Sequence, residues 1–283
     1  NNNGYAVCGI AGGTGNNDGV RIMSVQIFED EDGCYQHQLA RGFRYAADNG
    51  AVLINNSWGY EPDAYVSDRD FIAYDGVLKQ AIDYFQENAR LEGVMEGGVA
   101  IFAAGNETHS TAIYPGAYRD YICVSAIASD YTAAYYTNYG PGCNLCAPGG
   151  DINYGTVNCI SSTSTDLKWG YEYMQGTSMA TPHVTGCAAL ALSYALKQGY
   201  TLTPEYLRAL IQTSVHDINQ YQSGTKSFFD YASGSYYNLQ LSRYVDKLGS
   251  GYIDAHLLLM QLDSTPCLYL KTGEAAHLSL DEY

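Results

Sequence analysis

The sequence predicts an α/β fold in which a mostly parallel central sheet lies between two layers of helices. Short, continuous apolar segments alternate with segments whose apolar residues recur at helical spacing. Polar groups rich in Asn, Ser and Gly directly follow two of the apolar segments. Parallel strands need helices on both faces, and ligands bind beyond the carboxyl ends of such strands. The same pattern therefore predicts where the functional site lies.

The first part of the chain is expected to form two strands and a helix. Residues 20–28 are apolar and β-branched and follow a turn signal of Asn, Asp and Gly, which predicts a strand. Residues 36–49 carry apolar residues at helical spacing and stop at Gly50, which predicts a helix. Residues 51–54 form a short apolar run and predict a second strand.

The middle of the chain continues the alternation. Residues 71–91 have apolar residues on one side at helical spacing and predict one long amphipathic helix. Residues 99–104 and 121–128 are continuous apolar runs and predict two buried strands. The chain therefore offers strand and helix in turn, as a doubly covered sheet requires.

Beyond residue 180 the pattern is mostly helical. Residues 187–196 are small and apolar and suit a helix packed deep in a core. Thr203 followed by Pro204 supplies an N-cap and a proline at the first helical position, which predicts another helix. Residues 218–247 are rich in Tyr, Ser, Gln and Asn and predict an irregular surface excursion.

The pattern changes near residue 262, where Leu begins to alternate with polar residues. We therefore expect one main domain over residues 1–262. Residues 263–283 are expected to begin a C-terminal extension or β module. The first residue is Asn rather than Met, so we expect the chain to be a piece of a longer protein.

The charge balance excludes one class of partner. Fourteen basic residues face 30 acidic ones, which gives a formal net charge of −16. A nucleic-acid-binding surface needs a basic stripe, so no nucleic acid is expected as partner. No apolar run approaches the ~20 residues of a membrane span. A weakly charged chain with 28 Tyr and 30 Gly is typical of secreted proteins, so we expect a secreted, cell-surface or periplasmic location.

The eight cysteines do not define a site. Cys143 and Cys146 form a lone C-x-x-C motif without the second pair of ligands that a zinc site needs. The neighbouring prolines and glycines also differ from the helix start that a redox C-x-x-C occupies. We therefore expect most of the cysteines to be small buried apolar residues.

The most specific stretch is Gly-Thr-Ser-Met-Ala-Thr-Pro-His-Val-Thr-Gly at residues 176–186. Its serine, Ser178, opens an apolar helix after a glycine that allows close approach. The free N–H groups at a helix start favour an anion, which suits a nucleophile whose substrate develops an oxyanion. Serine is also a favoured N-cap, so spacing alone leaves Ser178 as either a nucleophile or a cap.

This stretch resembles the nucleophile segment of the subtilisin-like serine proteases, the subtilases. The likeness covers residues 1–262, and other motifs occur in the family's order: Asn55-Asn56-Ser57-Trp58-Gly59, Ala103-Ala104-Gly105-Asn106-Glu107, Tyr114-Pro115, Asn138-Tyr139-Gly140, Ala147-Pro148-Gly149 and residues 249–255. An ordered series of motifs is more specific than any one alone. The resemblance implies a three-layer subtilisin-like fold and an endopeptidase that acts on polypeptides through an acyl-enzyme.

The resemblance also assigns roles to particular residues. Ser178 is implied as the acylated nucleophile, and Asn106 as the side-chain donor to the oxyanion. The implied substrate-binding residues are two pocket walls, the neighbour of the nucleophile and the pocket floor: Ser57, Trp58 and Gly59; Ala103, Ala104 and Gly105; Thr177; and Ile113. Many relatives keep Gly at the position of Ile113. We therefore expect a shallow apolar pocket that prefers small or medium apolar side chains before the scissile bond.

Two motifs of the family are absent from the chain. The family's Asp-Ser/Thr-Gly and His-Gly-Thr-His segments do not occur, and none of the six histidines precedes a glycine. Serine at its ordinary pKa is a poor nucleophile without a base, so we expect the chain alone to be inactive. The resemblance implies that a strand is missing as well, because its Asp segment is a central strand. We therefore expect the sheet to lack its N-terminal strands, its neighbours to be unpaired and the chain to be poorly stable.

Two alternatives follow from this gap. The missing N-terminal segment is a potential partner of the chain, and with it the protein is an endopeptidase. The other alternative is a non-catalytic relative that keeps the cleft for peptide binding. His183 and His109 are the histidines nearest to the motifs in sequence, and we expect a structural role for the first and an exposed loop position for the second.

No cofactor is expected for the chemistry. The opening loop resembles the calcium loop of the family, so a structural calcium ion is compatible with the sequence. Asn3 would be one ligand, and the other ligands would lie upstream of the chain.

Overall fold

The computed structural model describes residues 7–16, 18–28, 34–165, 170–230 and 233–264. Its centre is a six-stranded sheet with the strand order β1-β4-β5-β6-β12-β9. The strands are β1 Leu53–Asn56, β4 Val99–Ala103, β5 Ile122–Ile127, β6 Leu145–Pro148, β12 Tyr252–Ile253 and β9 Val215–His216. The first five are parallel, and β9 runs antiparallel to β12. The predicted mostly parallel sheet is therefore confirmed.

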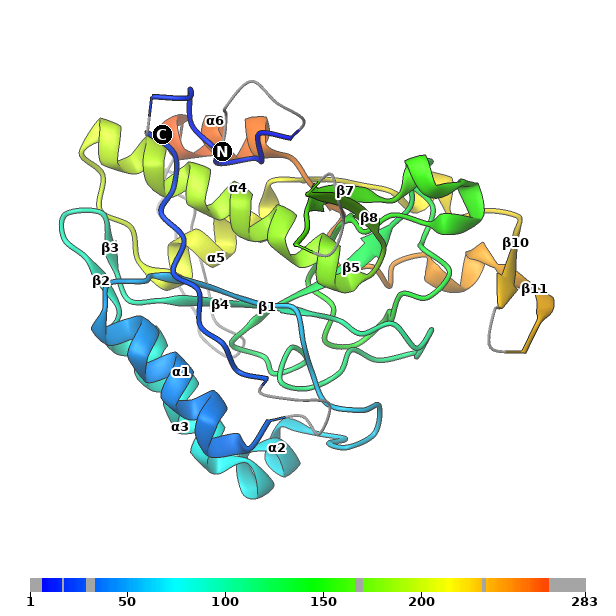
Figure 1. The fold of residues 1–283 in the computed structure, drawn as a ribbon, viewed down its shortest axis with the longest axis horizontal. Helices are drawn as coiled ribbons and strands as arrows, with labels where there is room; N and C mark the ends of the chain where they lie inside the picture. Colours follow the sequence, from blue (N-terminus) through cyan, green and yellow to red (C-terminus); the bar gives the residue numbers. More distant parts are fainter. Residues whose placement is uncertain (1–6, 17, 29–33, 166–169, 231–232, 265–283) are drawn as a thin grey trace, which may run out of the picture.

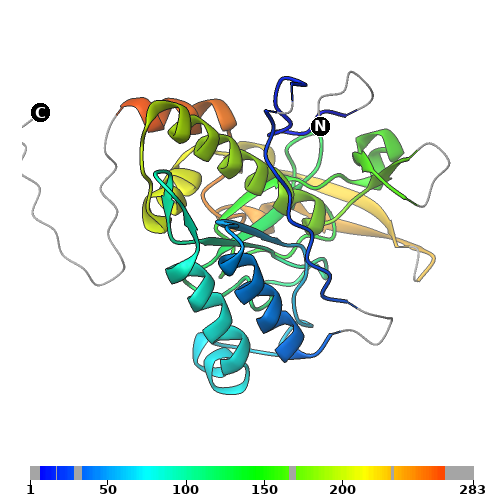
Figure 2. The same ribbon diagram turned by 60° about the vertical axis from the view of Figure 1, so that its left-hand side comes forward.

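Helices cover both faces of this sheet (Figure 1). On one face lie α1 Gln36–Asp48, α2 Asp68–Tyr74 and α3 Gly76–Asn88. On the other lie α4 Thr177–Gln198, α5 Pro204–Thr213 and α6 Ala255–Ser264. Figure 2 shows the same two layers from the side. The three-layer prediction is confirmed, and no helix among the described residues is long and apolar enough to span a membrane.

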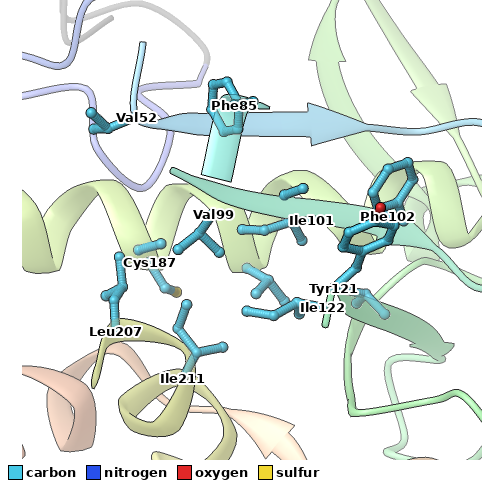
Figure 3. Close-up of a cluster of buried hydrophobic side chains, with 14 of the residues drawn as sticks. Val52, Phe85, Val99, Ile101, Phe102, Tyr121, Ile122, Cys187, Leu207 and Ile211 are labelled. Carbon is cyan, nitrogen blue, oxygen red and sulfur yellow. The ribbon is translucent and has the colours of Figure 1, made fainter. Parts of the chain in front are cut away.

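The core lies where these layers meet β4. All five residues of β4 are buried, as expected of a strand covered on both faces. Phe43 of α1 stacks on Phe102 with ring centroids 6.4 Å apart. Figure 3 shows Val99 near Cys187 of α4 and Leu207 of α5. These contacts fix β4 in the middle of the molecule, and its carboxyl end leads into the site.

The predicted helix over residues 71–91 is wrong in its length. Asp75 interrupts it between α2 and α3, with φ −128° and ψ 37°. The Tyr60 hydroxyl donates a hydrogen bond to the Asp75 carboxylate, which is fully buried. This contact from a distant part of the chain is invisible to helical periodicity. Beyond α3 the chain forms a small hairpin of β2 Arg90–Leu91 and β3 Met95–Glu96.

The predicted strand over residues 20–28 is absent. The segment pairs with no strand among the described residues, and the Ile22 side chain is 91% exposed. Val25 and Ile27 pack closely over Gly42 of α1, while Ile10, earlier in the chain, packs against Gly186 of α4. The chain over residues 10–27 therefore runs from one helix layer to the other. The only strand that pairs with β1 among the described residues is β4.

The prediction of an irregular excursion over residues 218–247 is also wrong in part. The segment contains an antiparallel hairpin of β10 Thr225–Asp230 and β11 Ser235–Gln240. Phe228 pairs with Tyr237 and Phe229 with Tyr236, and such aromatic cross-strand pairs stabilise hairpins. A further hairpin joins β7 Ile160–Thr163 to β8 Tyr171–Met174. Short 3-10 turns lie at Ile152–Tyr154, Thr156–Asn158, Asn219–Tyr221 and Leu241–Tyr244.

Four of the seven described cysteines are buried: Cys123, Cys146, Cys159 and Cys187. Cys8 is exposed, and Cys34 and Cys143 are half-buried, so the prediction of small buried residues holds for most of them. Residues 265–283 of the expected C-terminal module, Cys267 among them, lie outside the described residues. Helix α6 continues to Ser264, two residues past the expected end of the main domain.

Candidate active site

Ser178 occupies the first turn of α4, behind a glycine that its backbone requires. Gly176, the N-cap of α4, has φ +147°, a conformation that a side chain would strain. Its N–H donates to the carbonyl of Gly149 at 3.0 Å and to the Tyr136 hydroxyl at 2.9 Å. The loop that carries the serine is thereby tied to the end of β6.

The first turn of α4 also interlocks with the end of β1. The Ser178 hydroxyl donates to the carbonyl oxygen of Ser57 at 3.2 Å, and the Ser57 hydroxyl donates to the carbonyl of Ser178 at 2.8 Å. The Ser178 side chain is half-buried rather than enclosed. It is not a side-chain N-cap, because that position belongs to Gly176. The geometry therefore excludes the N-cap alternative that the sequence left open for Ser178.

Asn106 approaches the same turn from the end of β4. Its Oδ1 accepts hydrogen bonds from the backbone N–H of Thr177 at 2.8 Å and from the Thr177 hydroxyl at 3.0 Å. Because the oxygen is occupied, the amide nitrogen Nδ2 is the group that remains to donate. Among the described residues it has no hydrogen-bond partner.

Two N–H donors converge in front of Gly176. The position that a Cβ on Gly176 would take lies 3.6 Å from the backbone nitrogen of Ser178 and 3.7 Å from Asn106 Nδ2. The Ser178 N–H belongs to the first helical turn and has no acceptor within the helix. A developing negative oxygen placed between these donors would be stabilised by both, which is the arrangement of an oxyanion hole.

A cavity of about 160 Å³ opens beside Ser178. Its lining includes both proposed catalytic residues and seven of the eight predicted substrate-binding residues: Ser57, Trp58, Gly59, Ala103, Gly105, Ile113 and Thr177. Ala104 is the exception, because it is fully buried beneath the loop, where its carbonyl accepts hydrogen bonds from Ile113 and Asn138. Sequence reasoning missed Tyr60, Glu61 and Glu107, which also line the cavity.

Ile113 limits the depth of this cavity. A Cβ on Gly59 would lie 2.5 Å from Ile113 Cδ1, so the side chain reaches across to the opposite wall. This contact also explains the glycine, since any side chain there would collide with Ile113. The crossing side chain is consistent with a shallow pocket, but the lining also presents polar groups, Glu61 and Glu107 among them, so the apolar character that the sequence predicts is limited to part of the cavity.

The charges at the cavity come from carboxylates rather than from its tyrosine. Burial, together with a hydrogen bond to Asp75, raises the pKa of Tyr60, so its phenol stays neutral. Burial likewise raises the pKa of Asp75. Glu61 and Glu107 are exposed carboxylates in the lining, so the cleft carries negative charge.

Three of the five described histidines have side-chain partners of their own. His183 contacts the carbonyl of Met179, one turn earlier in α4, at 2.8 Å, in agreement with its expected structural role. His109 is only half-exposed and contacts Thr111 at 2.9 Å, with Asp63 3.6 Å from its other nitrogen. His216 binds Asp254 at 2.6 Å. Among the residues that the structure describes, no histidine hydrogen-bonds to Ser178.

A metal site finds no support in the part of the chain that the structure describes. No group of three His, Cys, Asp or Glu side chains there has the geometry to hold an ion. Asn3, the expected calcium ligand, lies outside the described residues. The calcium expectation is therefore untested.

The fold and the serine at the start of a core helix define a class of α/β serine hydrolases, and comparison with known proteins identifies the family. The family model of the subtilases matches residues 1–237. The chain belongs to the subtilase family.

Relatives with known names support this assignment. The chain is 32% identical over 246 residues to the thermophilic serine proteinase of Bacillus sp. strain AK1, an alignment covering 84% of the chain and 52% of that protein. It is 30% identical over 208 residues to thermitase of Thermoactinomyces vulgaris, covering 74% of the chain and 61% of the relative. The chain thus spans about half the length of the first of these relatives.

A solved structure shares the fold. The patellamide maturation protease PatA aligns with a TM-score of 0.59 and 27% identity, over 84% of this chain and 73% of that one. The predicted subtilisin-like fold is therefore confirmed.

Proposed function

We propose that the chain is most of the catalytic domain of a serine endopeptidase. The observation that carries this proposal is that Asn106 Nδ2 and the Ser178 backbone nitrogen both lie within 3.7 Å of one point in front of Gly176, two residues before Ser178 in the chain. Ser178 Oγ attacks the substrate carbonyl, and the two donors stabilise the resulting oxyanion. The proton of Ser178 passes to a base and from there to the leaving amine, which leaves an acyl-enzyme for water to hydrolyse.

The base in this proposal comes from a segment outside the chain. No described histidine hydrogen-bonds to Ser178, and the family motifs for the base and its aspartate are absent from the sequence. Among the residues that the structure describes, β1 pairs on one side only, and its other edge offers a place for an added strand. We expect residues 1–283 alone to hydrolyse peptides poorly and the longer protein to be active.

The substrate is a polypeptide with a small or medium apolar side chain before the scissile bond. Support comes from the Ile113 side chain, which spans the cavity to Gly59. A peptide library read by mass spectrometry tests this preference. Efficient cleavage after Phe or Arg would contradict it.

We propose that the protein acts outside the cytoplasm. The relative from Natrialba magadii is named as an extracellular serine protease, at 32% identity over 199 residues. No cofactor enters the proposed chemistry, and structural calcium remains a proposal that equilibrium dialysis of the longer protein would test.

Labelling with a fluorophosphonate tests the proposed nucleophile. The longer protein, with its upstream sequence, should be labelled at Ser178, and Ser178→Ala should abolish the label. Ser110→Ala is the matched control, because Ser110 is exposed and does not line the cavity. A longer protein that takes up no label at Ser178 would overturn the proposal.

That failure would favour a second function, peptide binding without catalysis. The observation on its side is that no described histidine hydrogen-bonds to Ser178. A binding module has no need of an oriented Asn106, which is why we prefer the enzyme. Binding of unmodified peptides by the Ser178→Ala protein, combined with no labelling of the unmodified serine, would identify the module.

A further inference from the structure

Asn138, a buried asparagine outside the proposed catalytic set, makes all its side-chain hydrogen bonds to the loop that carries Asn106. Asn138 lies between β5 and β6 and has no exposed surface. Its side chain reaches residues 104–109, which we call the oxyanion loop. A buried amide needs partners for two N–H groups and for its oxygen, and their identity shows what the residue holds in place.

Each polar atom of the Asn138 amide is satisfied by the oxyanion loop. Nδ2 donates to the Ala104 carbonyl at 3.0 Å and to a carboxylate oxygen of Glu107 at 2.7 Å. Oδ1 accepts from the backbone N–H groups of Glu107 at 3.0 Å and His109 at 2.8 Å. The backbone N–H of Asn138 adds a bond to the Gly105 carbonyl at 3.1 Å.

These hydrogen bonds reach residues both before and after Asn106 in the chain. The Glu107 carboxylate that Asn138 holds also accepts from the Asn106 N–H, at 2.9 Å. Gly105 leaves room for this arrangement, because a Cβ there would lie 2.2 Å from Asn138 Nδ2. Its φ of +103° also favours glycine. The backbone of Asn106 is therefore held through Glu107 and Asn138, while Thr177 orients its side chain.

We propose that Asn138 is a positioning residue for the oxyanion donor Asn106. It acts through the oxyanion loop and touches neither Ser178 nor the cavity. Glu107 is the intermediate between the two asparagines. This inference rests on the proposed function, because it assigns Asn106 to the oxyanion hole.

The expected effect is on the chemical step rather than on substrate binding. A displacement of a catalytic group by about 1 Å costs on the order of 10²-fold in rate. Asn138→Ala should therefore lower kcat in the longer, active protein by about that factor, with KM nearly unchanged.

A double-mutant comparison separates positioning from general stability. Asn106→Ala combined with Asn138→Ala should have the same kcat as Asn106→Ala alone, because a positioning residue has nothing left to position. Asn144→Ala is the matched control: Asn144 also lies between β5 and β6, and its Oδ1 accepts from Cys123 N–H at 2.7 Å, away from the oxyanion loop. It should change thermal stability while leaving kcat near the wild-type value.

Two kinetic outcomes would overturn the inference. One is a kcat for Asn138→Ala within about threefold of wild type. The other is a double variant whose loss is the product of the two single losses, as independent sites give.

A second measurement does not require catalysis. Hydrogen–deuterium exchange of the longer protein should show protected amides at Glu107 and His109, and Asn138→Ala should expose both. Equal exchange in the two proteins would refute the positioning role. If the wild-type protein is inactive but this protection is present, the proposed function fails while the loop contacts of Asn138 stand.

Discussion

Two strands of the central sheet differ in how completely they are paired: β4 at its centre and β1 at its edge. β4 is buried along its whole length, pairs with strands on both sides and leads into the oxyanion loop, which Asn138 and Thr177 hold through hydrogen bonds. β1 pairs on one side only among the described residues, and the extended residues 20–28 near it expose Ile22 and Phe28. The proposed oxyanion hole lies in the first region. The difference suggests that the chain builds the oxyanion half of a catalytic site and leaves the side of the base to another segment.

Removing a large side chain from each region should show the sharpest contrast. Phe102 of β4 is fully buried and has ring contacts with Phe43, Trp58 and Tyr121. Phe102→Ala should lower the free energy of unfolding by about 3–5 kcal/mol, through lost burial and an unfilled cavity. Ile22→Ala, at a side chain 91% exposed, should change it by less than about 0.5 kcal/mol. Urea unfolding followed by circular dichroism measures both values.

The Ile22→Ala variant also tests whether an added strand pairs with the edge of β1 in the longer protein. If an added strand covers residues 20–28 there, Ile22→Ala should cost more in the longer protein than in residues 1–283. Equal small costs in both would mean that this edge stays open, contrary to the proposed completion of the sheet.

The next effect concerns the oxyanion hole. In the longer, active protein, Asn106→Ala should lower kcat by about 10²–10³-fold, or roughly 3–4 kcal/mol, which is the loss known for one such donor in a subtilisin. KM should change little, because the donor acts mainly on the transition state. Steady-state hydrolysis of a chromogenic peptide gives both constants.

Ser110→Ala serves as a control on the same stretch of chain, because Ser110 is exposed and does not line the cavity. It should retain the kcat of the wild-type protein. A loss for Asn106→Ala that appears only in KM would assign Asn106 to substrate binding instead.

The sequence was sufficient to predict the β4 region but not the β1 edge, for a physical reason. Residues 99–104 and 176–186 form contiguous segments, so a local pattern predicts both the strand and the nucleophile turn. Residues 20–28 have an equally strong strand pattern, but a strand needs a partner, and local composition does not say whether one is present. The structure supplies none among the described residues.

Other features involve contacts between residues that are apart in sequence. Asp75, where the predicted helix is interrupted, accepts a hydrogen bond from Tyr60, and the oxyanion loop is held by Asn138, which is 31 positions from Glu107. The hairpin of β10 and β11 was hidden by its Tyr- and Ser-rich composition, although its aromatic residues pair across the strands. In contrast, most residues of the cavity lining lie at or just beyond the ends of β1 and β4, where a local pattern predicts a site, whereas Ile113, Thr177 and Ser178 come from other segments.

The smallest expected effect concerns specificity at the cavity. Ile113→Gly should deepen the cavity, because the Ile113 side chain now reaches the wall at Gly59. In the active protein, the ratio of kcat/KM for Phe over Ala before the scissile bond should rise by about 10–200-fold, the range that changes in a hydrophobic pocket produce. Ile152→Gly is a matched control away from this cavity, and it should leave the ratio unchanged. A ratio that stays constant in Ile113→Gly would show that Ile113 does not form the floor of the pocket. The β4 region would then account for the proposed oxyanion hole but not for the specificity of the cavity.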